Sequence, residues 1–561
     1  MHRIFLLLLL LVISGQSYAI KTEVSEEVSE RINEQVNKKV NKKTHSKLSS
    51  LLNQLPKTTL RNMATLIERI SQTKKPLTRN VLQLMLDGEL YYLKANKQLV
   101  RAQNVANRLY KLTDLLTGQS LPDVKKSKLS KVRTNNRLRS TLRSIIAKID
   151  LTDENKKVRL KAVQQLLSSP GKESTAIIAE LIDTEKDQDV QALMATILSL
   201  QQLKSGNHGE KIKALQQLSD SLEPTVKNEV VRLLANLSQK ERSVEQQILN
   251  DVLSHTLEKM ESRASFYSLL ETVFFGLSLG SVLLLAAVGL AITFGVMGVI
   301  NMAHGEMIML GAYTTYVIQL AFPSMIEYSL LIAVPAAFVV SGSVGVIIER
   351  GVIRFLKGRP LETLLATFGI SLILQQLVRT IFSPLNRQVI SPEWMSGSWQ
   401  INPIFSLTFN RLYIIIFSVF VFISLLMILK KTSLGLHVRA VSQNRDMARA
   451  LSIKSNRVDA ITFGLGSGIA GVAGVVLSQL TNVGPNLGQA YIIDSFLVVV
   501  FGGVGNLWGT LVAAVSLGLT NKFLEPVTGT VLANIIVLVG LVLFIQKRPK
   551  GLFPQKGRST D

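Results

Sequence analysis

The chain of 561 residues contains no cysteine. That absence excludes disulfide bonds, thiolate metal sites and cysteine nucleophiles, and it is compatible with any cellular compartment. Acidic residues are also scarce: 39 Asp and Glu stand against 63 Lys and Arg, which gives a formal charge of +24. The sequence has neither a zinc-finger spacing nor a basic motif with interleaved aromatic residues. We therefore expect no nucleic acid partner in spite of the charge.

The motifs of several enzyme classes are missing as well. The sequence has no G-x-S-x-G or H-E-x-x-H motif and no G-x-x-x-x-G-K-[ST] phosphate loop. A hydrolase triad, a zinc-protease helix and a phosphate loop for ATP are therefore not expected. We predict that the chain is not an enzyme and has no catalytic residues, no cofactor and no metal site.

The first residues, "MHRIFLLLLLLVISGQSYAIK", have the pattern of a signal peptide. Arg3 precedes an apolar core, and Ser17 and Ala19 fit the small-residue cleavage rule. We predict a signal peptide over 1–19 that is cleaved after Ala19. The alternative is an uncleaved anchor helix, but the apolar core is short for a span.

Residues 20–265 are polar and are predicted to form an exported helical domain. Apolar residues recur at three- and four-residue spacing over 158–169, 190–203, 211–222 and 226–239. Each run predicts an amphipathic helix of about three turns. Stacked HEAT-like pairs and an ordinary helical bundle both fit this pattern. We interpret the domain as an interaction or scaffolding module.

Residues 266–553 consist of long apolar segments that approach the length of membrane-spanning helices. The segments are 269–300, 302–322, 329–353, 363–382, 411–429, 458–480, 491–520 and 530–546. Basic residues cluster over 430–457 and towards the tail at 554–561, so both regions are expected in the cytoplasm. An even number of crossings must then separate them. We therefore predict that the segment 491–520 is re-entrant and turns at Gly502, Gly503 and Gly505.

Polar residues interrupt the apolar half at several points. Asn301, His304 and Glu306 lie between the first two segments, where three interpretations stay open: a cytoplasmic turn, the lining of a solute pathway, or a metal site. The spacing of His304 and Glu306 disfavours the metal site, because residues two apart face different sides of a helix. Further polar candidates for a pathway are Thr367, Gln375, Gln376, Asn482 and Asp494.

The basic loop at 437–453 is predicted to form a short amphipathic helix that docks onto another protein. Asn444 is placed to cap this helix, and Ala448 and Leu451 supply an apolar face. Arg439 and Arg445 flank the face. A solvated loop without a partner would have a similar composition.

These motifs resemble a known family. The pattern from Arg439 to Ala448 is similar to the coupling loop of permeases in the branched-chain amino acid class of ABC importers. "GLAITFGVMGVINMAHGEMIMLGAY", "FLVVVFGGVGNLWG" and "RPKGLF" also resemble that class. "GRPLETLLATFGISLILQQLVR" and "NVGPNLGQAYIIDSF" are similar to its urea-type subunit, which often carries an exported N-terminal extension. Ser452 departs from the family, which usually has glycine at that position.

The resemblance implies an all-α fold, in which a polytopic membrane permease follows a helical exported domain. It also implies a second permease subunit, two cytoplasmic ATPase subunits and an exported solute-binding protein. The expected function is import of urea, a small polar solute, across the bacterial inner membrane. A permease for branched-chain or other amino acids is the alternative. A membrane-anchored binding or sensory protein is the alternative from another class.

Overall fold

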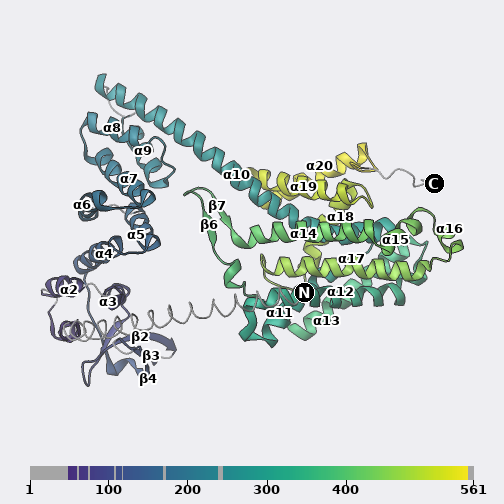
Figure 1. The fold of residues 1–561 in the computed structure, drawn as a ribbon, viewed down its shortest axis with the longest axis horizontal. Coiled ribbons are helices and arrows are strands. Elements are labelled where there is room, and N and C mark those ends of the chain that lie inside the picture. The colour runs from purple at the N-terminus through teal and green to yellow at the C-terminus, as the bar shows by residue number, and fades with distance from the viewer. Residues whose placement is uncertain are drawn as a thin grey trace, which may run out of the picture. The chain divides into compact units, whose positions relative to one another are not determined.

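The computed structural model describes residues 48–553 except 60–61, 74–75, 107–108, 116–117, 169–171 and 238–243. The predicted signal peptide at 1–19 and the tail at 554–561 lie outside the described residues and stay predictions. The chain divides into two compact units, residues 1–221 with 225–258 and residues 259–561 with 222–224 (Figure 1). The first unit is called the polar unit below and the second the membrane unit.

Short amphipathic helices make up most of the polar unit. They are α2 (Met63–Ser71), α3 (Pro76–Asp87), α4 (Asn136–Leu151), α5 (Lys156–Ser168), α6 (Lys172–Leu181), α7 (Gln188–Ser205), α8 (His208–Leu218) and α9 (Pro224–Leu237). The four helical runs predicted from the sequence fall in α5, α7, α8 and α9. Polar caps begin several of them: Asn207 and Glu210 form a capping box at the start of α8. The HEAT-like stacking of these helices stays a prediction.

The expectation of a wholly helical polar unit needs a correction at residues 90–131. Five strands form an antiparallel sheet there in the order β4-β3-β2-β1-β5. They are β1 (Leu90–Leu93), β2 (Leu99–Ala106), β3 (Leu109–Asp114), β4 (Ser120–Lys125) and β5 (Leu129–Lys131). Side chains of β3 alternate between outside and inside, and Tyr110 and Leu112 are among the buried ones. This two-residue period is typical of a strand with one face on a core.

The membrane unit confirms the predicted polytopic helical architecture. Seven helices of the described residues are long and apolar enough to cross a membrane. They are α10 (Val244–Met297), α12 (Ser329–Gly351), α13 (Pro360–Phe382), α14 (Phe409–Lys431), α17 (Ser455–Ser478), α19 (Leu507–Thr528) and α20 (Thr530–Lys547). The helices α11 (His304–Ala321), α15 (Ser433–Gln443), α16 (Arg445–Ala450) and α18 (Leu487–Gly502) complete the unit, with a small hairpin of β6 (Ser398–Gln400) and β7 (Ser406–Thr408).

Helix α17 lies at the centre of the membrane unit. Within its apolar window 89% is buried, against 11% for α20 at the periphery. Small residues on α17 allow this packing: a Cβ atom added to Gly466 would lie 2.6 Å from the carbonyl oxygen of Gly289 on α10. Helices α11 and α12 also pack closely on α17. Close approach through small residues is a common means of holding membrane helices together.

Candidate functional site

The chain breaks between α10 and α11, at the polar segment that interrupts the first apolar run. Helix α10 ends at Met297, Gly298 has a φ of 69°, and α11 begins at His304. The side-chain oxygen of Asn301 accepts a hydrogen bond of 3.0 Å from the backbone amide of Ala303. Asn301 is 2% exposed. The segment is therefore a buried discontinuity between the two helices, and its place on the cytoplasmic side stays a prediction.

Glu306 forms the centre of a buried polar cluster. Its Oε1 atom accepts hydrogen bonds from the Ser371 hydroxyl at 2.9 Å and from the Gln375 amide at 2.7 Å. Its Oε2 atom is buried and has no hydrogen-bond partner in the described part of the chain. A buried acceptor without a partner costs about 1–3 kcal/mol, so this atom is poised to accept a further donor.

His304 has a different environment from Glu306. Its Nε2 atom lies 2.9 Å from the carbonyl oxygen of Ala286 on α10, and the side chain is fully buried. Because a carbonyl oxygen only accepts, Nε2 must carry the proton and donate. Within the described residues, no three His, Asp or Glu side chains are grouped as metal ligands would be. We interpret His304 as a link between α10 and α11.

Polar side chains line one face of α13 at four-residue spacing. Thr363, Thr367, Ser371 and Gln375 are each buried, although most of the other side chains of this helix are exposed. The Thr367 hydroxyl accepts a hydrogen bond of 3.2 Å from the Met302 amide in the segment before α11. Residues four apart lie on one face of a helix, so this set, called the α13 stripe below, is continuous. Arg379, four residues after Gln375, lies on the same face of α13 and donates a hydrogen bond of 2.7 Å to Asn486.

The α13 stripe unites some of the predicted pathway residues and leaves others apart. Thr367 and Gln375 lie on it and contact the segment with Asn301 and Glu306. Gln376 is exposed on another face of α13, and Asn482 is exposed in the loop between α17 and α18. Asp494 lies on α18 in a separate cavity. The sequence analysis missed Thr363 and Ser371, which the four-residue spacing with Thr367 and Gln375 would have indicated.

The predicted turn at Gly502, Gly503 and Gly505 separates α18 from α19. Gly503 and Gly505 have φ values of 102° and 79°, which a side chain would disfavour. The turn packs on the C-terminal segment, where the amides of Leu552 and Phe553 donate to the carbonyl oxygens of Phe501 and Gly502. A Cβ atom on Gly295, near the end of α10, would also come within 2.6 Å of Gly505. The turn therefore lies beside the end of α10 and the C-terminal segment.

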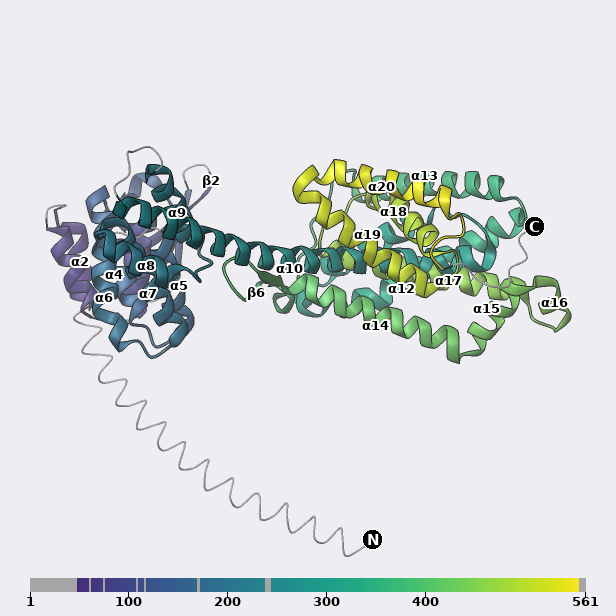
Figure 2. The same cartoon turned by 90° about the horizontal axis from the view of Figure 1, so that it is seen from above.

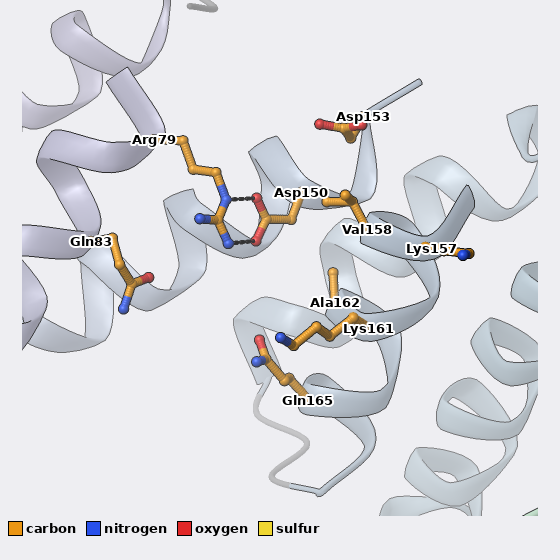
Figure 3. Close-up of a pocket in the computed structure, with 9 residues that line it drawn as sticks. All are labelled: Arg79, Gln83, Asp150, Asp153, Lys157, Val158, Lys161, Ala162 and Gln165. Atoms are coloured by element: carbon orange, nitrogen blue, oxygen red, sulfur yellow. Dashed lines mark hydrogen bonds and ion pairs between the residues drawn. The ribbon is translucent and has the colours of Figure 1, made fainter. Parts of the chain in front are cut away.

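A different cavity, of about 630 Å³, lies in the polar unit between α3, α4 and α5. Figure 3 shows Arg79 of α3 and Asp150 of α4 facing each other in its wall, joined by hydrogen bonds of 2.5 and 2.9 Å. Asp150 is buried, and this bidentate pair satisfies both of its oxygens. We interpret the pair as a structural link between the two helices.

Comparison with known proteins identifies the membrane unit. Residues 272–546 match the model of a family described as the permease component of branched-chain amino acid transport systems. The high-affinity branched-chain amino acid permease LivH of Escherichia coli K12 is 29% identical over 297 residues, which cover 51% of this chain and 96% of LivH. Residues 272–546 form an ABC importer permease.

Two further relatives are also described as permeases. BraD of Pseudomonas aeruginosa, also a branched-chain amino acid permease, is 28% identical over 51% of this chain and 96% of its own length. The ribose import permease RbsC of Escherichia coli K12 is 29% identical over 36% of this chain and 63% of its own length. The names of these relatives describe permease proteins of transport or import systems, not enzymes. No solved structure matches the chain significantly.

The predicted coupling loop consists of α15 and α16, which lie at one end of the membrane unit (Figures 1 and 2). Asn444 caps α16, and its side-chain oxygen accepts from the amides of Asp446 and Met447 at 3.1 and 3.0 Å. Leu451 is 73% exposed and Met447 is 61% exposed. Arg439 donates to the carbonyl oxygen of Leu429 at the end of α14.

One part of the predicted apolar face is placed differently in the structure. Ala448 is 2% exposed and packs into the core of its own chain, so it is not available to another subunit. The sequence pattern indicates which residues share a face, but it does not say which side of the helix turns inward. Met447 and Leu451 are the large apolar side chains of α16 and its end that stay exposed.

A buried ion network connects this loop to the central helix, and the sequence analysis missed it. Arg445 donates to both oxygens of Asp459, on the first turns of α17, at 2.6 and 3.1 Å. Lys357, from the segment between α12 and α13, also donates to Asp459 and lies 3.8 Å from Glu349. Asp459 and Glu349 are almost fully buried. A lone acid at the start of an apolar segment, beside a basic loop, was the available signal.

Proposed function

We propose that this permease imports a small, neutral, nitrogen-containing solute and that the solute is urea. The α13 stripe carries the proposal, because it lines a buried face with hydroxyl and amide groups. Urea has both N–H donors and a carbonyl acceptor. A solute of this kind can exchange hydrogen bonds with hydroxyl and amide side chains along the pathway, so no polar group of the solute or of the stripe is left unpaired.

The break between α10 and α11 supports the same proposal. Discontinuous helices in transporters often place polar groups next to the solute pathway. Glu306 lies within the first turn of α11, and its Oε2 atom lacks a partner among the described residues. We propose that Asn301, Glu306, Thr367 and Gln375 border the pathway and that His304 has the structural role described above.

Transport of branched-chain or other amino acids is the second candidate. The names of LivH and BraD favour it, since both are described as branched-chain amino acid permeases. The urea-type motifs in the sequence favour urea instead. An amino acid would bring an ammonium and a carboxylate group. The four side chains of the α13 stripe carry no positive charge to match the carboxylate, and Arg379, further along the same face, already donates to Asn486.

We propose that the remaining subunits follow the plan of this importer class. One of two ATPase subunits would dock on the exposed Met447 and Leu451 of the coupling loop, and a second permease and an exported solute-binding protein would complete the complex. We also propose that the chain is oriented with the polar unit exported and the C-terminus in the cytoplasm. The contact of the C-terminal segment with the Gly502 turn supports the orientation, because the cavity that contains Gly505 is also lined by Lys430 and Arg439 of the basic loop.

Labelled-solute uptake in a strain that lacks this gene tests the proposal. Restoring the gene should restore saturable urea uptake, which excess unlabelled urea abolishes and excess leucine leaves unchanged. Restored leucine uptake without urea uptake would establish the amino acid alternative. Failure of any ATPase to co-purify with the chain would favour a membrane-anchored binding or sensory protein.

A further inference from the structure

A second polar cavity lies in the membrane unit, apart from the α13 stripe. Its volume is about 290 Å³, and side chains of α10, α18, α19 and α20 line it. Leu279, Leu283 and Leu497 form an apolar wall, whereas Asp494 and Tyr491 of α18 contribute polar groups. A mostly apolar cavity with a few polar groups is the usual form of a small-molecule site.

Most polar side chains of this cavity already have partners. Lys522 and Glu525 of α19 form an ion pair, and the Thr530 hydroxyl donates to Glu525 at 3.1 Å. Asn521 of α19 donates to Asn534 of α20. The contacts of Thr530 and Asn534 join α20 to α19, and Glu525 balances the charge of Lys522 within α19.

Asp494 differs from these residues because it makes no hydrogen bond or ion pair within the described part of the chain, and its side chain is exposed rather than covered by the protein. It lies on α18 between Ile493 and Ser495, in a helix that is otherwise strongly apolar. A carboxylate in a membrane segment is costly and usually marks a functional position. The cation that lines the cavity, Lys522, is already paired with Glu525 and does not pair with Asp494.

We infer that the Asp494 cavity binds the N–H donor group of the transported solute. An ionised carboxylate only accepts hydrogen bonds, and its two oxygens match two parallel N–H donors such as those of urea or an amidinium. The ammonium group of an amino acid has the same donor chemistry. The inference rests on the proposed transport function and assigns to Asp494 a site distinct from the α13 stripe.

A divalent cation is a poorer match for this cavity. Calcium takes six to eight oxygen ligands, and magnesium requires an octahedral set. No group of three acidic or histidine side chains surrounds a common point in the described residues. The cavity offers one unpaired carboxylate, which suits a single donor group.

Equilibrium dialysis of the purified complex, without its solute-binding protein, tests the site directly. Labelled urea should show a saturable component that excess guanidinium displaces and that tetramethylurea, which has no N–H group, leaves in place. The variant Asp494→Asn should lose this component, and Asp494→Glu should retain it. Binding that is unchanged in Asp494→Asn would overturn the inference.

The solute dependence of uptake into proteoliposomes separates this site from other roles. Asp494→Asn should raise the half-saturating solute concentration about tenfold, the effect of losing one hydrogen bond to a charged group, so the uptake rate at low solute should fall by the same factor. Glu393→Gln, the same change at an exposed carboxylate between α13 and α14, should leave the rate unchanged. Loss of the second permease subunit from the Asp494→Asn complex would show that Asp494 pairs with that subunit and would contradict the inference. If the wild-type complex transports neither urea nor leucine, the proposed function fails first.

Discussion

At the scale of single residues, Ser452 shows how the coupling loop tolerates a serine in a conformation that favours glycine. Ser452 follows α16 with a φ of 64°, a left-handed conformation that glycine adopts without strain. The turn forms nonetheless, because the Ile453 amide donates to the Ala448 carbonyl oxygen at 3.0 Å. The departure from the glycine of the family therefore leaves the turn intact and adds local strain.

Replacing this serine should stabilise the loop. A non-glycine residue in the left-handed region costs about 1–2 kcal/mol, which the change to glycine would remove. About half of this gain would be lost, because glycine has greater conformational entropy in the unfolded chain. Ser452→Gly should therefore raise the thermal unfolding midpoint of the purified complex slightly. Ser442→Gly, a matched change inside α15, should lower it. A lower midpoint for Ser452→Gly would contradict the interpretation of strain.

Two adjacent glutamines of α13 allow a controlled test of the stripe. Gln375 is 3% exposed and donates to Glu306, whereas Gln376 is exposed on another face. Gln375→Leu leaves Glu306 with one donor fewer, at a cost of about 1–3 kcal/mol. Urea uptake should fall about tenfold or more in this variant and stay near wild type in Gln376→Leu. Equal uptake by the two variants would remove the stripe from the pathway.

At the scale of elements, the coupling loop has an inner face and an outer face. Leu451→Asp adds a charge at an exposed position and should leave the permease folded but abolish co-purification of the ATPase. Ala448→Asp buries a charge in the permease's own core, where an unpaired charge costs several kcal/mol. It should lower the unfolding midpoint of the permease itself. Normal ATPase binding by Leu451→Asp would show that the docking surface lies elsewhere.

The Asp459 network links three elements: the coupling loop, the segment between α12 and α13, and the central helix α17. Asp459→Asn leaves Arg445 and Lys357 without their shared carboxylate. Breaking a buried ion pair in this way costs about 3–5 kcal/mol of stability. The cost should be smaller here, because both cations are partly exposed to solvent. We expect fewer solute molecules imported per ATP hydrolysed, with the basal ATPase rate retained.

A second variant separates this linking role from simple destabilisation. The double change Asp459→Asn with Arg445→Gln removes a positive charge together with the negative one, so part of the stability should return. The coupling ratio should stay low, because the loop is still detached from α17. A coupling ratio equal to that of the wild type in Asp459→Asn would contradict the proposed link.

At the scale of the whole molecule, sequence patterns predicted where helices form better than they predicted which residues contact one another. Long apolar runs and three-to-four spacing predicted the spans and the helices α5, α7, α8 and α9. The sheet at residues 90–131 was missed, although "LYKLTD" alternates with the period of a strand, because its strands are short and lie among helical runs. Periodicity describes one segment at a time. It therefore could not show that Glu306 meets the α13 stripe, that Ala448 faces inward or that Asp459 joins two distant loops.

Initial rates of ATP-dependent uptake into proteoliposomes test the central claim most directly. The complete complex should be supplied with labelled urea and labelled leucine in parallel, at matched concentrations and with saturated binding protein. We predict saturable urea uptake that requires ATP, with leucine uptake at the background level. ATP-dependent leucine uptake with no urea uptake would contradict the account of a neutral-solute pathway along the α13 stripe.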